Sequence, residues 1–338
     1  MHYLITGHTG FKGAWLTLLL VSRGHSVSGL ALDPAPGSLF ERAGLAELLV
    51  NDFRVDIRDA EATRTVITQA GADVVLHLAA QPLVRESYRA PRATFDTNVM
   101  GTLAVLEAIA QTPSTRAAVI VTTDKVYRNV NQVEGYVESD PLGGHDPYSS
   151  SKAMADLLTQ SWVASFPGVA TGVARAGNVI GGGDVSPDRL LPDLLRSFER
   201  GEAAVIRYPD AVRPWQHVLD CLNGYLALVD ALLAGTGAGE WNFGPGPESF
   251  VTVRGLADLV VEQYGHGASW TTDGSVQPHE AQLLALDAGK AEAALGWHNK
   301  LSFAESVGWT VDWSLRQAAR DSAATVARDQ IERFESLA

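Results

Sequence analysis

The feature that most constrains this chain is a glycine-rich segment near its start, Thr6-Gly7-His8-Thr9-Gly10-Phe11-Lys12-Gly13. It follows a short apolar run over residues 2–6 and precedes residues 11–23, whose apolar positions recur at helical spacing. Glycines spaced G-x-x-G-x-x-G between a strand and a helix allow a tight turn, and they let backbone N–H groups approach a pyrophosphate. The segment therefore predicts a dinucleotide site, although an ordinary glycine turn would fit the same residues.

Continuous apolar runs without alternation recur through the first half of the chain, over residues 26–32, 74–78 and 117–121. Residues 91–110 between the last two read as a helix. Strands that are buried on both faces lack alternation because helices cover each face of a parallel sheet. The pattern predicts a doubly wound (Rossmann) α/β fold.

The pattern changes after about Asn178, where helices are expected over 190–200, 218–233, 253–264, 288–295 and from 301 onward. Short strands near residue 205 and over 241–243 interrupt them. We expect a dinucleotide-binding domain over 1–178 and a smaller, mixed substrate-binding lobe over most of 179–338. Segments of about 205–235 are expected to return to the first domain.

Charge and composition narrow the classes of partner. The net charge of −13 gives no overall attraction for nucleic acid or for an anionic membrane. No apolar run approaches the roughly 20 residues that a membrane-spanning helix needs. The single cysteine, Cys221, excludes an intramolecular disulfide and a multi-cysteine metal site, and we expect a cytoplasmic protein without a metal. An anionic small ligand would need local cations.

Two acidic positions bear on the choice of dinucleotide. Asp33 ends the second predicted strand, where a carboxylate can accept hydrogen bonds from the adenosine ribose and would repel a 2′-phosphate. No Arg or Lys lies between Arg23 and Arg42 to attract that phosphate, which favours NAD over NADP. Alternatively, Asp33 merely starts a turn before Pro34. Asp56 and Ile57 follow a further short strand and could reach the adenine edge.

Tyr148 and Lys152 form a Tyr-x-x-x-Lys pair just after Pro147, a residue suited to a helix start. Their spacing puts both side chains on one helical face. A phenol with a pKa of about 10 is a poor base at neutral pH. A neighbouring ammonium and a cationic nicotinamide ring would lower that pKa, so that Tyr148 could take a proton from a hydroxyl as hydride leaves the same carbon. A chance helical pair is the alternative.

A second pair follows the predicted strand over 117–121, in the segment Thr122-Thr123-Asp124-Lys125. Active sites of open α/β sheets lie at the carboxyl ends of the strands. Thr123 could hydrogen-bond the hydroxyl that Tyr148 addresses. Asp124 and Lys125 form an acid–base pair that a simple dehydrogenase does not need but an enzyme that also eliminates water does. A solvated Asp-Lys pair at a strand end would fit equally well.

The chain resembles the extended short-chain dehydrogenases that act on sugar nucleotides, and within them it is most similar to the CDP-glucose 4,6-dehydratases. The glycine loop and the Tyr148/Lys152 pair belong to the whole superfamily. The more specific motifs are His77-Leu78-Ala79-Ala80-Gln81-Pro82-Leu83-Val84-Arg85, Thr97-Asn98-Val99-Met100-Gly101-Thr102, Thr123-Asp124-Lys125, Gly143-Gly144-His145-Asp146-Pro147-Tyr148, Arg175-Ala176-Gly177-Asn178-Val179-Ile180-Gly181-Gly182-Gly183-Asp184, Arg213-Pro214-Trp215-Gln216-His217-Val218, Trp241-Asn242-Phe243-Gly244-Pro245 and Pro278-His279-Glu280-Ala281.

The resemblance implies an NAD-dependent lyase that makes a 4-keto-6-deoxy sugar. Tyr148, helped by Thr123, would deprotonate the sugar O4, and Lys152 would hold the nicotinamide ribose. Lys125 would remove the C5 proton and Asp124 would protonate the departing C6 hydroxyl. The implied cofactor-binding residues are Gly7, Thr9, Gly10, Phe11, Lys12, Gly13, Asp33, Asp56, Ile57, Leu78, Ala79, Ala80, Tyr148 and Lys152.

By the same resemblance, the substrate is a nucleotide sugar, most similar to CDP-glucose, and its diphosphate needs positive partners. The implied substrate-binding residues are Arg85, Asn178, Arg189, Arg207, Arg213 and His279. Arginine suits this task because its planar fork binds phosphate oxygens bidentately. Solvated surface charge is the alternative for Arg189 and Arg207. The chain departs from the family over residues 128–139, which lack tryptophan, and at His145, where relatives carry tyrosine. The exact sugar therefore stays open.

Other functions remain open at this point. A UDP-N-acetylglucosamine or dTDP-glucose 4,6-dehydratase would use the same groups, whereas a 4-epimerase would not need Asp124 and Lys125. A non-catalytic dinucleotide sensor usually lacks the catalytic Tyr or Lys. The helices over 91–110 and 148–165 resemble the pair that forms a four-helix dimer interface in this family. We therefore expect a homodimer or a higher homo-oligomer.

Overall fold

The computed structural model describes residues 1–132, 134–272 and 284–337. Its central element is a seven-stranded sheet in the order β10-β6-β5-β4-β1-β2-β3, and every neighbouring pair in it is parallel. The strands are β1 (His2–Thr6), β2 (Ser26–Ala31), β3 (Asp52–Arg54), β4 (Val74–His77), β5 (Ala117–Val121), β6 (Ala170–Ala176) and β10 (Gly239–Phe243). This order confirms the predicted doubly wound α/β fold.

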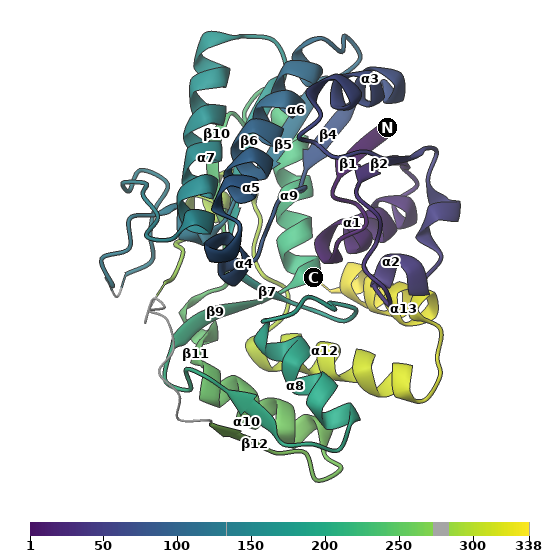
Figure 1. Ribbon diagram of the computed structural model, residues 1–338, viewed down its shortest axis with the longest axis vertical. Helices are drawn as coiled ribbons and strands as arrows, with labels where there is room; N and C mark the ends of the chain where they lie inside the picture. The colour runs from purple at the N-terminus through teal and green to yellow at the C-terminus, as the bar shows by residue number, and fades with distance from the viewer. Residues whose placement is uncertain (133, 273–283, 338) are drawn as a thin grey trace.

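Helices cover both faces of this sheet, as Figure 1 shows. On one face lie α1 (Phe11–Ser22), α2 (Leu39–Arg42), α9 (Val218–Leu233), α11 (Gly289–Leu295) and α13 (Ala323–Ser336). On the other lie α3 (Ala60–Ala70), α4 (Val84–Arg89), α5 (Pro91–Phe95), α6 (Gly101–Ala110) and α7 (Pro147–Ser165). Neighbouring residues of β1 divide between the two layers, because Ile5 packs in the cluster with α1 and α9 while Leu4 packs with α3 and α6. Burial on both faces explains the continuous apolar runs.

The predicted helix over 91–110 forms as one run in which a π-helical segment, Asp96–Met100, joins α5 to α6. Asn98 lies in this segment, and its Oδ1 accepts a hydrogen bond of 2.8 Å from the backbone N of Gln81. Its Nδ2 donates to Ser151 Oγ at 2.8 Å. Local π-helical turns often occur at functional sites. Here the turn ties the loop after β4 to α7.

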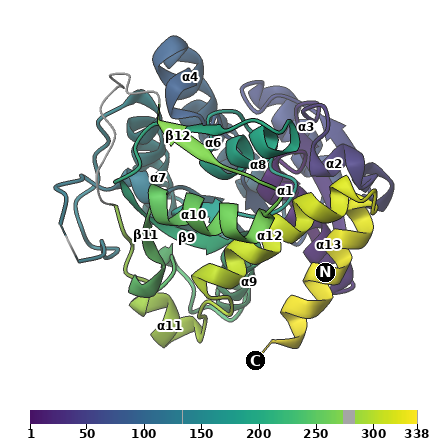
Figure 2. The ribbon, with the colours of Figure 1, turned by 90° about the horizontal axis from the view of Figure 1, so that it is seen from below.

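A smaller group of elements lies at the carboxyl ends of the strands (Figures 1 and 2). It contains a mixed three-stranded sheet, ordered β11-β9-β7, and the parallel pair β12-β8. These elements are β7 (Asn178–Ile180), β8 (Ala204–Ile206), β9 (Val212–His217), β11 (Phe250–Thr252), β12 (Trp270–Thr272), α8 (Leu190–Glu199), α10 (Val253–Tyr264) and α12 (Phe303–Ala318). They enclose a separate apolar core that includes Leu194, Trp215 and Val260.

The chain passes between the two groups more than once. The segment that returns to the large sheet comprises α9 and β10, residues 218–243, whereas β8 and β9 pair within the small sheets. The division into a cofactor domain over 1–178 and a substrate lobe over 179–338 stays a prediction. Within the parts of the chain that the structure describes, no helix is long and apolar enough to cross a membrane.

Candidate active site

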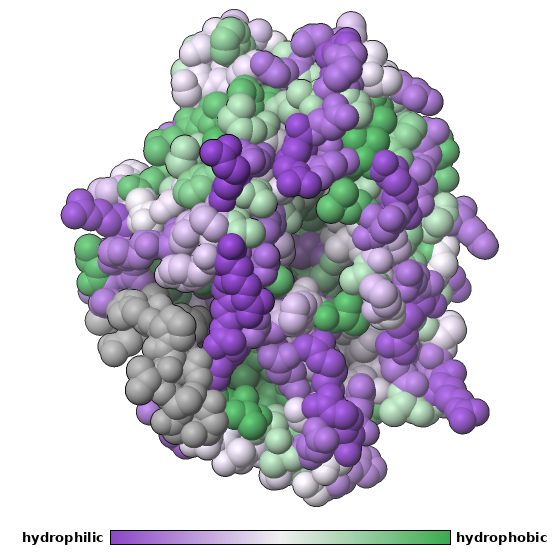
Figure 3. All heavy atoms as spheres, in the orientation of Figure 1, coloured by the Kyte–Doolittle hydropathy of each residue, from purple (hydrophilic) through white to green (hydrophobic). Residues whose placement is uncertain are grey.

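A cleft of about 970 Å³ lies between the large sheet and the smaller group of elements. Figure 3 shows a hollow near the middle of the face presented in Figure 1. The predicted site residues that line the cleft are Gly7, Thr9, Gly10, Phe11, Lys12, Gly13, Asp56, Ile57, Leu78, Ala79, Ala80, Arg85, Thr123, Asp124, Lys125, Tyr148, Lys152, Asn178, Arg189, Arg207 and Arg213. Asp33 is not among the lining residues, and His279 lies outside the described residues.

The glycine loop leaves no room for side chains at two of its positions. Gly7 has a φ of +78°, and a Cβ there would lie 2.8 Å from the backbone N of Ala79. A Cβ on Gly13 would lie 2.2 Å from the carbonyl oxygen of Gly7. Glycine is required at both, because only its backbone tolerates this turn and this close approach. The turn points the N-terminus of α1, at Phe11, into the cleft, and its free N–H groups suit an anion.

The surroundings of Asp33 differ from the expectation that no cation is near. Its side chain is 91% exposed, and Oδ1 lies 3.9 Å from Nε of Arg54, which comes from β3. Arg54 is held by Asp52, whose Oδ2 accepts from Nη2 at 2.6 Å, and its guanidinium stacks on the ring of Phe40. This cation lies outside residues 23–42 in the sequence, and it comes close to Asp33 because β3 pairs in parallel with β2.

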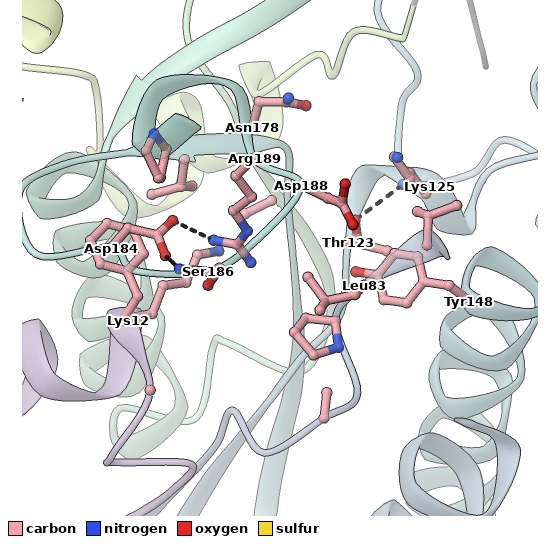
Figure 4. A pocket seen from close by; sticks show the side chains of 18 of the residues that line it. Lys12, Leu83, Thr123, Lys125, Tyr148, Asn178, Asp184, Ser186, Asp188 and Arg189 are labelled. Carbon is pink, nitrogen blue, oxygen red and sulfur yellow. Dashed lines mark hydrogen bonds and ion pairs between the residues drawn. The ribbon is translucent and has the colours of Figure 1, made fainter. Parts of the chain in front are cut away.

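Tyr148 and Lys152 project from the first turns of α7 into the cleft. Asp146 starts this helix, accepting a hydrogen bond of 2.9 Å from the backbone N of Ser149. Burial raises the pKa of Tyr148 to about 12, and a hydrogen bond with Thr123 opposes the shift. Burial lowers the pKa of Lys152 to about 8, with a further lowering from the nearby Lys12 cation. Figure 4 shows Thr123 beside the ring of Tyr148.

Asp124 follows on the short 3₁₀ turn Asp124–Val126 and is 2% exposed. Thr123 Oγ1 donates a hydrogen bond of 2.8 Å to its Oδ1. Its Oδ2 has no hydrogen-bond partner among the described residues, and a Cβ on Gly177 would come within 3.2 Å of that oxygen. Burial raises the pKa of Asp124, and the Lys125 ammonium partly opposes the shift. The site therefore favours a protonated carboxyl group next to a lysine.

Three of the four predicted substrate-binding arginines are engaged by carboxylates that were not among the predicted site residues. Asp188 Oδ1 accepts from Nη1 of Arg85 at 3.3 Å and from Nη1 of Arg207 at 3.0 Å. Asp184 Oδ2 accepts from Nη1 of Arg189 at 2.9 Å, a pair drawn in Figure 4. Asp184 is the last residue of the family motif over residues 175–184, whereas Asp188 lies outside every motif quoted from the sequence. Its φ of +60° is a backbone conformation that no sequence pattern here indicates.

Further lining residues were not named as site residues from the sequence, although Pro82, Leu83, Val84 and Trp215 lie in the quoted motifs. Most of them are apolar or small side chains, which carry no chemical signature of their own. They include Pro82, Leu83, Val84, Tyr88, Ser186, Leu190, Val205, Tyr208 and Trp215.

The chain resembles known proteins both in sequence and in fold. Residues 3–244 match the NAD dependent epimerase/dehydratase family. The chain belongs to this family. Among its relatives, the CDP-glucose 4,6-dehydratase of Salmonella typhimurium is 47% identical over 91% of this chain and 89% of its own length. The dTDP-glucose 4,6-dehydratase of Streptomyces antibioticus is 31% identical over 93% of this chain and 92% of its own length.

Solved structures of the family agree with the fold. The dTDP-glucose 4,6-dehydratase DesIV of Streptomyces venezuelae, solved with NAD bound, superposes with a TM-score of 0.81 at 25% identity. The match covers 95% of this chain and 98% of that one. The UDP-glucose 4-epimerase of Thermus thermophilus, solved with NAD, has a TM-score of 0.80 at 26% identity, covering 93% and 99%. Since dehydratases and epimerases share this fold, the fold does not separate them.

Proposed function

We propose that this chain is an NAD-dependent nucleotide-sugar 4,6-dehydratase that converts CDP-glucose to CDP-4-keto-6-deoxyglucose. One observation carries the proposal. The buried carboxyl group of Asp124, with one oxygen lacking a hydrogen-bond partner among the described residues, lies next to Lys125 in the same cleft as Tyr148 and Lys152. An alcohol oxidation needs only the latter two. A water elimination also needs an acid and a base, which Asp124 and Lys125 supply.

The residues of the cleft fit NAD. The glycine turn and the N-terminus of α1 would hold the pyrophosphate, since a Cβ at Gly7 or Gly13 would meet backbone atoms. Asp56 and Ile57 would line the adenosine end, and Lys152 would hold the nicotinamide ribose. NAD, when bound, accepts the hydride from the sugar C4 and returns it to C6. Asp33, exposed beside Arg54, would meet the adenosine ribose only at the rim of the cleft.

Oxidation at C4 depends on Tyr148. With a pKa of about 12, the phenol is not a base in the ligand-free chain. The positive charge of a bound nicotinamide and the ammonium of Lys152 would stabilise the phenolate and bring that pKa down. Tyr148 then takes the O4 proton, while the Thr123 hydroxyl hydrogen-bonds the same oxygen. The sugar leaves this step as a 4-ketone.

Elimination across C5 and C6 depends on Asp124 and Lys125. The 4-keto group acidifies the C5–H bond, and Lys125, when neutral, takes that proton. The C6–O bond breaks as Asp124 delivers its proton to the departing hydroxyl, which leaves as water. Burial raises the pKa of Asp124 and so favours the protonated form from which it would deliver this proton. Lys125 returns a proton to C5 as hydride adds at C6. Tyr148 then holds the O4 proton and Asp124 lacks the one it delivered, so passage of a proton from Tyr148 to Asp124, by way of the Thr123 hydroxyl that hydrogen-bonds both, would restore both groups for the next cycle.

The substrate's diphosphate would be bound by the arginines on the far wall of the cleft. Arg189, Arg207 and Arg213 lie there with Asn178, and Arg85 reaches the same part of the cleft from α4, so that their guanidiniums offer local positive charge in a chain of net charge −13. CDP-glucose is proposed as substrate because the 47% identical relative is a CDP-glucose 4,6-dehydratase. The predicted role of His279 stays a prediction.

The experiment that tests this function is an incubation of pure protein with CDP-glucose, dTDP-glucose and UDP-N-acetylglucosamine. Formation of a 4-keto-6-deoxy product, followed by its alkaline absorbance, is expected with CDP-glucose. Product from another nucleotide sugar alone would retain the dehydratase and reassign its substrate. An inverted C4 with no loss of water would identify a 4-epimerase, and no product from any substrate would refute the dehydratase.

A non-catalytic dinucleotide sensor is the remaining alternative from a different class, and nothing in the cleft favours it, because Tyr148 and Lys152 are both present and buried. Tyr148→Phe removes the proposed base while retaining the ring. Turnover should fall about 10²–10⁴-fold. Unchanged turnover in this variant would show that Tyr148 is not the base.

Assembly as a homodimer is part of the proposal. Met100 is 54% exposed on the π-helical segment, while Met154 and Leu157 are 47% and 51% exposed on α7. These two elements pack side by side, so their apolar side chains offer one face to a second copy. A monomeric mass by light scattering at micromolar concentration would contradict it. We also propose a cytoplasmic location, which the buried free thiol of Cys221 supports.

A further inference from the structure

A fully buried ion pair lies directly behind the active site, outside the groups that the proposed mechanism uses. Arg175 of β6 donates from Nε to Asp156 Oδ2 and from Nη2 to Oδ1, both at 2.8 Å. The two side chains are 1% and 0% exposed. A buried ion pair is weak support for stability, since well-packed apolar residues often do as well. The geometry that this pair imposes on its neighbours is therefore of interest.

Asp156 holds Thr122, the residue just before residues 123–126, which carry the acid–base pair Asp124 and Lys125. The hydroxyl of Thr122 donates to Asp156 Oδ2 at 3.0 Å, and Gln160 Nε2 donates to Oδ1 at 2.8 Å. Together with the guanidinium, these donors give the carboxylate four hydrogen bonds, so that its orientation is fixed from four directions. Asp156 also lies one helical turn beyond Lys152 on α7.

Arg175 holds Tyr127, the residue just after residues 123–126. Its Nη1 donates to the hydroxyl of Tyr127 at 2.9 Å and to the carbonyl oxygen of Glu138 at 3.1 Å. The Tyr127 hydroxyl in turn donates to Asn242 Oδ1 at 2.7 Å, and the guanidinium lies 5.0 Å from the centre of the Tyr127 ring. The same guanidinium thus fixes Tyr127 and the backbone of the loop that follows it.

The acid–base residues between these two anchors have little support of their own. Asp124 and Lys125 lie on a short 3₁₀ turn, whose backbone hydrogen bonds from Val126 to Thr123 and from Tyr127 to Asp124 are both 3.3 Å long. Tyr148 and Lys152, in contrast, project from the 19-residue helix α7. The turn is therefore held largely from outside, by the flanking Thr122 and Tyr127, by the burial of Val126 and by a hydrogen bond of 2.8 Å from Gly143 N to the carbonyl oxygen of Val126.

We propose that Asp156 and Arg175 are positioning residues for the elimination step, holding the Asp124–Lys125 pair through Thr122 and Tyr127. The proposal rests on the proposed function. A displacement of about 1 Å in a catalytic group can lower a rate about 10²-fold, so loss of either anchor should slow elimination strongly. Oxidation at C4 should slow less than elimination, because α7 places Tyr148 and only Thr123, which assists that step, adjoins the anchored Thr122.

The test cuts each anchor without breaking the ion pair. Thr122→Val removes the hydroxyl that Asp156 holds, and Tyr127→Phe removes the one that Arg175 holds. The same substitutions at buried positions away from the pair, Thr112→Val just after α6 and Tyr3→Phe on β1, are the matched controls. Removing Asp156 or Arg175 itself would strand a buried charge and risk unfolding, so those variants are avoided.

Three quantities are measured with CDP-glucose on the purified protein loaded with NAD. They are the overall kcat and KM, the absorbance at about 340 nm of bound reduced cofactor, and the exchange of the C5 proton with deuterated water. Both anchor variants should lose about 10–100-fold in kcat and in C5 exchange, with KM within about threefold. Reduced cofactor should accumulate, because oxidation outpaces elimination. The control variants should match the unmodified protein.

Two results would overturn the proposal. One is an equal loss of oxidation and elimination in the anchor variants, which is what a merely structural role would produce. The other is a C5 exchange rate no lower in the anchor variants than in Thr112→Val and Tyr3→Phe. Failure of the proposed function is distinguishable from both, because the unmodified protein would then neither reduce its cofactor nor form product.

Discussion

The ammonium of Lys152 donates a hydrogen bond of 2.8 Å to the carbonyl oxygen of Val121, the last residue of β5. This bond joins α7 to the carboxyl end of the strand, where Thr122 and Thr123 lead into the Asp124–Lys125 pair. Lys152 is 6% exposed, so its charge lies in a poorly solvated position. Burying the Lys152 ammonium beside the proposed catalytic groups therefore lowers the free energy of unfolding of the ligand-free protein.

The first prediction follows from this cost. Burial lowers the pKa of Lys152 from 10.5 to about 8, so the unfolded chain binds more protons than the folded chain between these values. Stability therefore rises with pH across that window, and at pH 7 the full penalty is about 3 kcal/mol. Lys152→Met should abolish turnover yet stabilise the ligand-free protein by about 1–3 kcal/mol at pH 7. Urea unfolding measures the stability.

The control for this prediction is Lys290→Met, since Lys290 is exposed on α11. It should change neither turnover nor the pH dependence of stability. A Lys152→Met variant that is less stable than the unmodified protein at pH 7 would show that its hydrogen bond outweighs the cost of burying the charge.

A second prediction concerns Asp220, at the start of α9. Burial raises its pKa to about 7, against hydrogen bonds from the backbone N–H groups of Lys300 and Leu301. The folded chain therefore keeps a proton that the unfolded chain releases near pH 4. Stability falls as pH rises from about 4 to about 7, and Asp220→Asn removes this loss. Between pH 5 and pH 8 the variant should gain about 2–3 kcal/mol relative to the unmodified protein.

Thermal unfolding at several pH values measures the gain, and Asp312→Asn on the exposed side of α12 is the control. A difference between Asp220→Asn and the unmodified protein that stays constant from pH 5 to pH 8 would contradict the raised pKa of Asp220.

The sequence predicted the strands and helices well where a single local pattern decides them. Residues 117–121 form β5 and residues 218–233 form α9 with the expected bounds, because continuous burial leaves a clear signal. The π-helical turn at Asp96–Met100 was not predicted, since its cause is the tertiary network of Asn98. The pairing of β10 with β6 was likewise not predicted, because it joins segments that are distant in sequence.

The candidate site divides in the same way. The glycine loop and the Tyr148/Lys152 pair were found because their spacing carries a chemical reason. Arg54 beside Asp33 and Asp188 between two arginines were missed, because each contact joins segments that are distant in sequence. Such partners are visible only once the fold brings the strands and loops together.

A third prediction uses the proximity of Arg54 to Asp33. Asp33→Ser removes the carboxylate that would repel a 2′-phosphate. The guanidinium of Arg54, whose Nε lies 3.9 Å from Asp33 Oδ1, would remain to attract that phosphate. Affinity for NADP should rise about tenfold, while NAD should bind less tightly. Titration of cofactor fluorescence measures both. The double variant Asp33→Ser/Arg54→Ala should lose the gain, and unchanged NADP affinity in the single variant would exclude Arg54 as a phosphate partner.

A fourth prediction concerns Asp188, whose carboxylate accepts hydrogen bonds from Arg85 and Arg207 inside the cleft. An anionic diphosphate must compete with this carboxylate for the two guanidiniums. Asp188→Asn removes the charge while keeping a side chain that tolerates the positive φ of this position. The KM for CDP-glucose should fall about 3–10-fold with little change in kcat, since the change affects binding and not the reacting atoms.

The salt dependence of KM separates this effect from a change in loop conformation. In the Asp188→Asn variant, the loss of one negative charge beside the two guanidiniums should make substrate binding weaken more steeply as salt rises, because screening acts on the increased positive charge of the cleft. Asp210→Asn is the matched control: its carboxylate is 83% exposed and pairs with Arg254 instead of a proposed substrate-binding arginine. A higher KM in Asp188→Asn, with an unchanged salt dependence, would mean that Asp188 serves to orient the arginines for the diphosphate and does not compete with it.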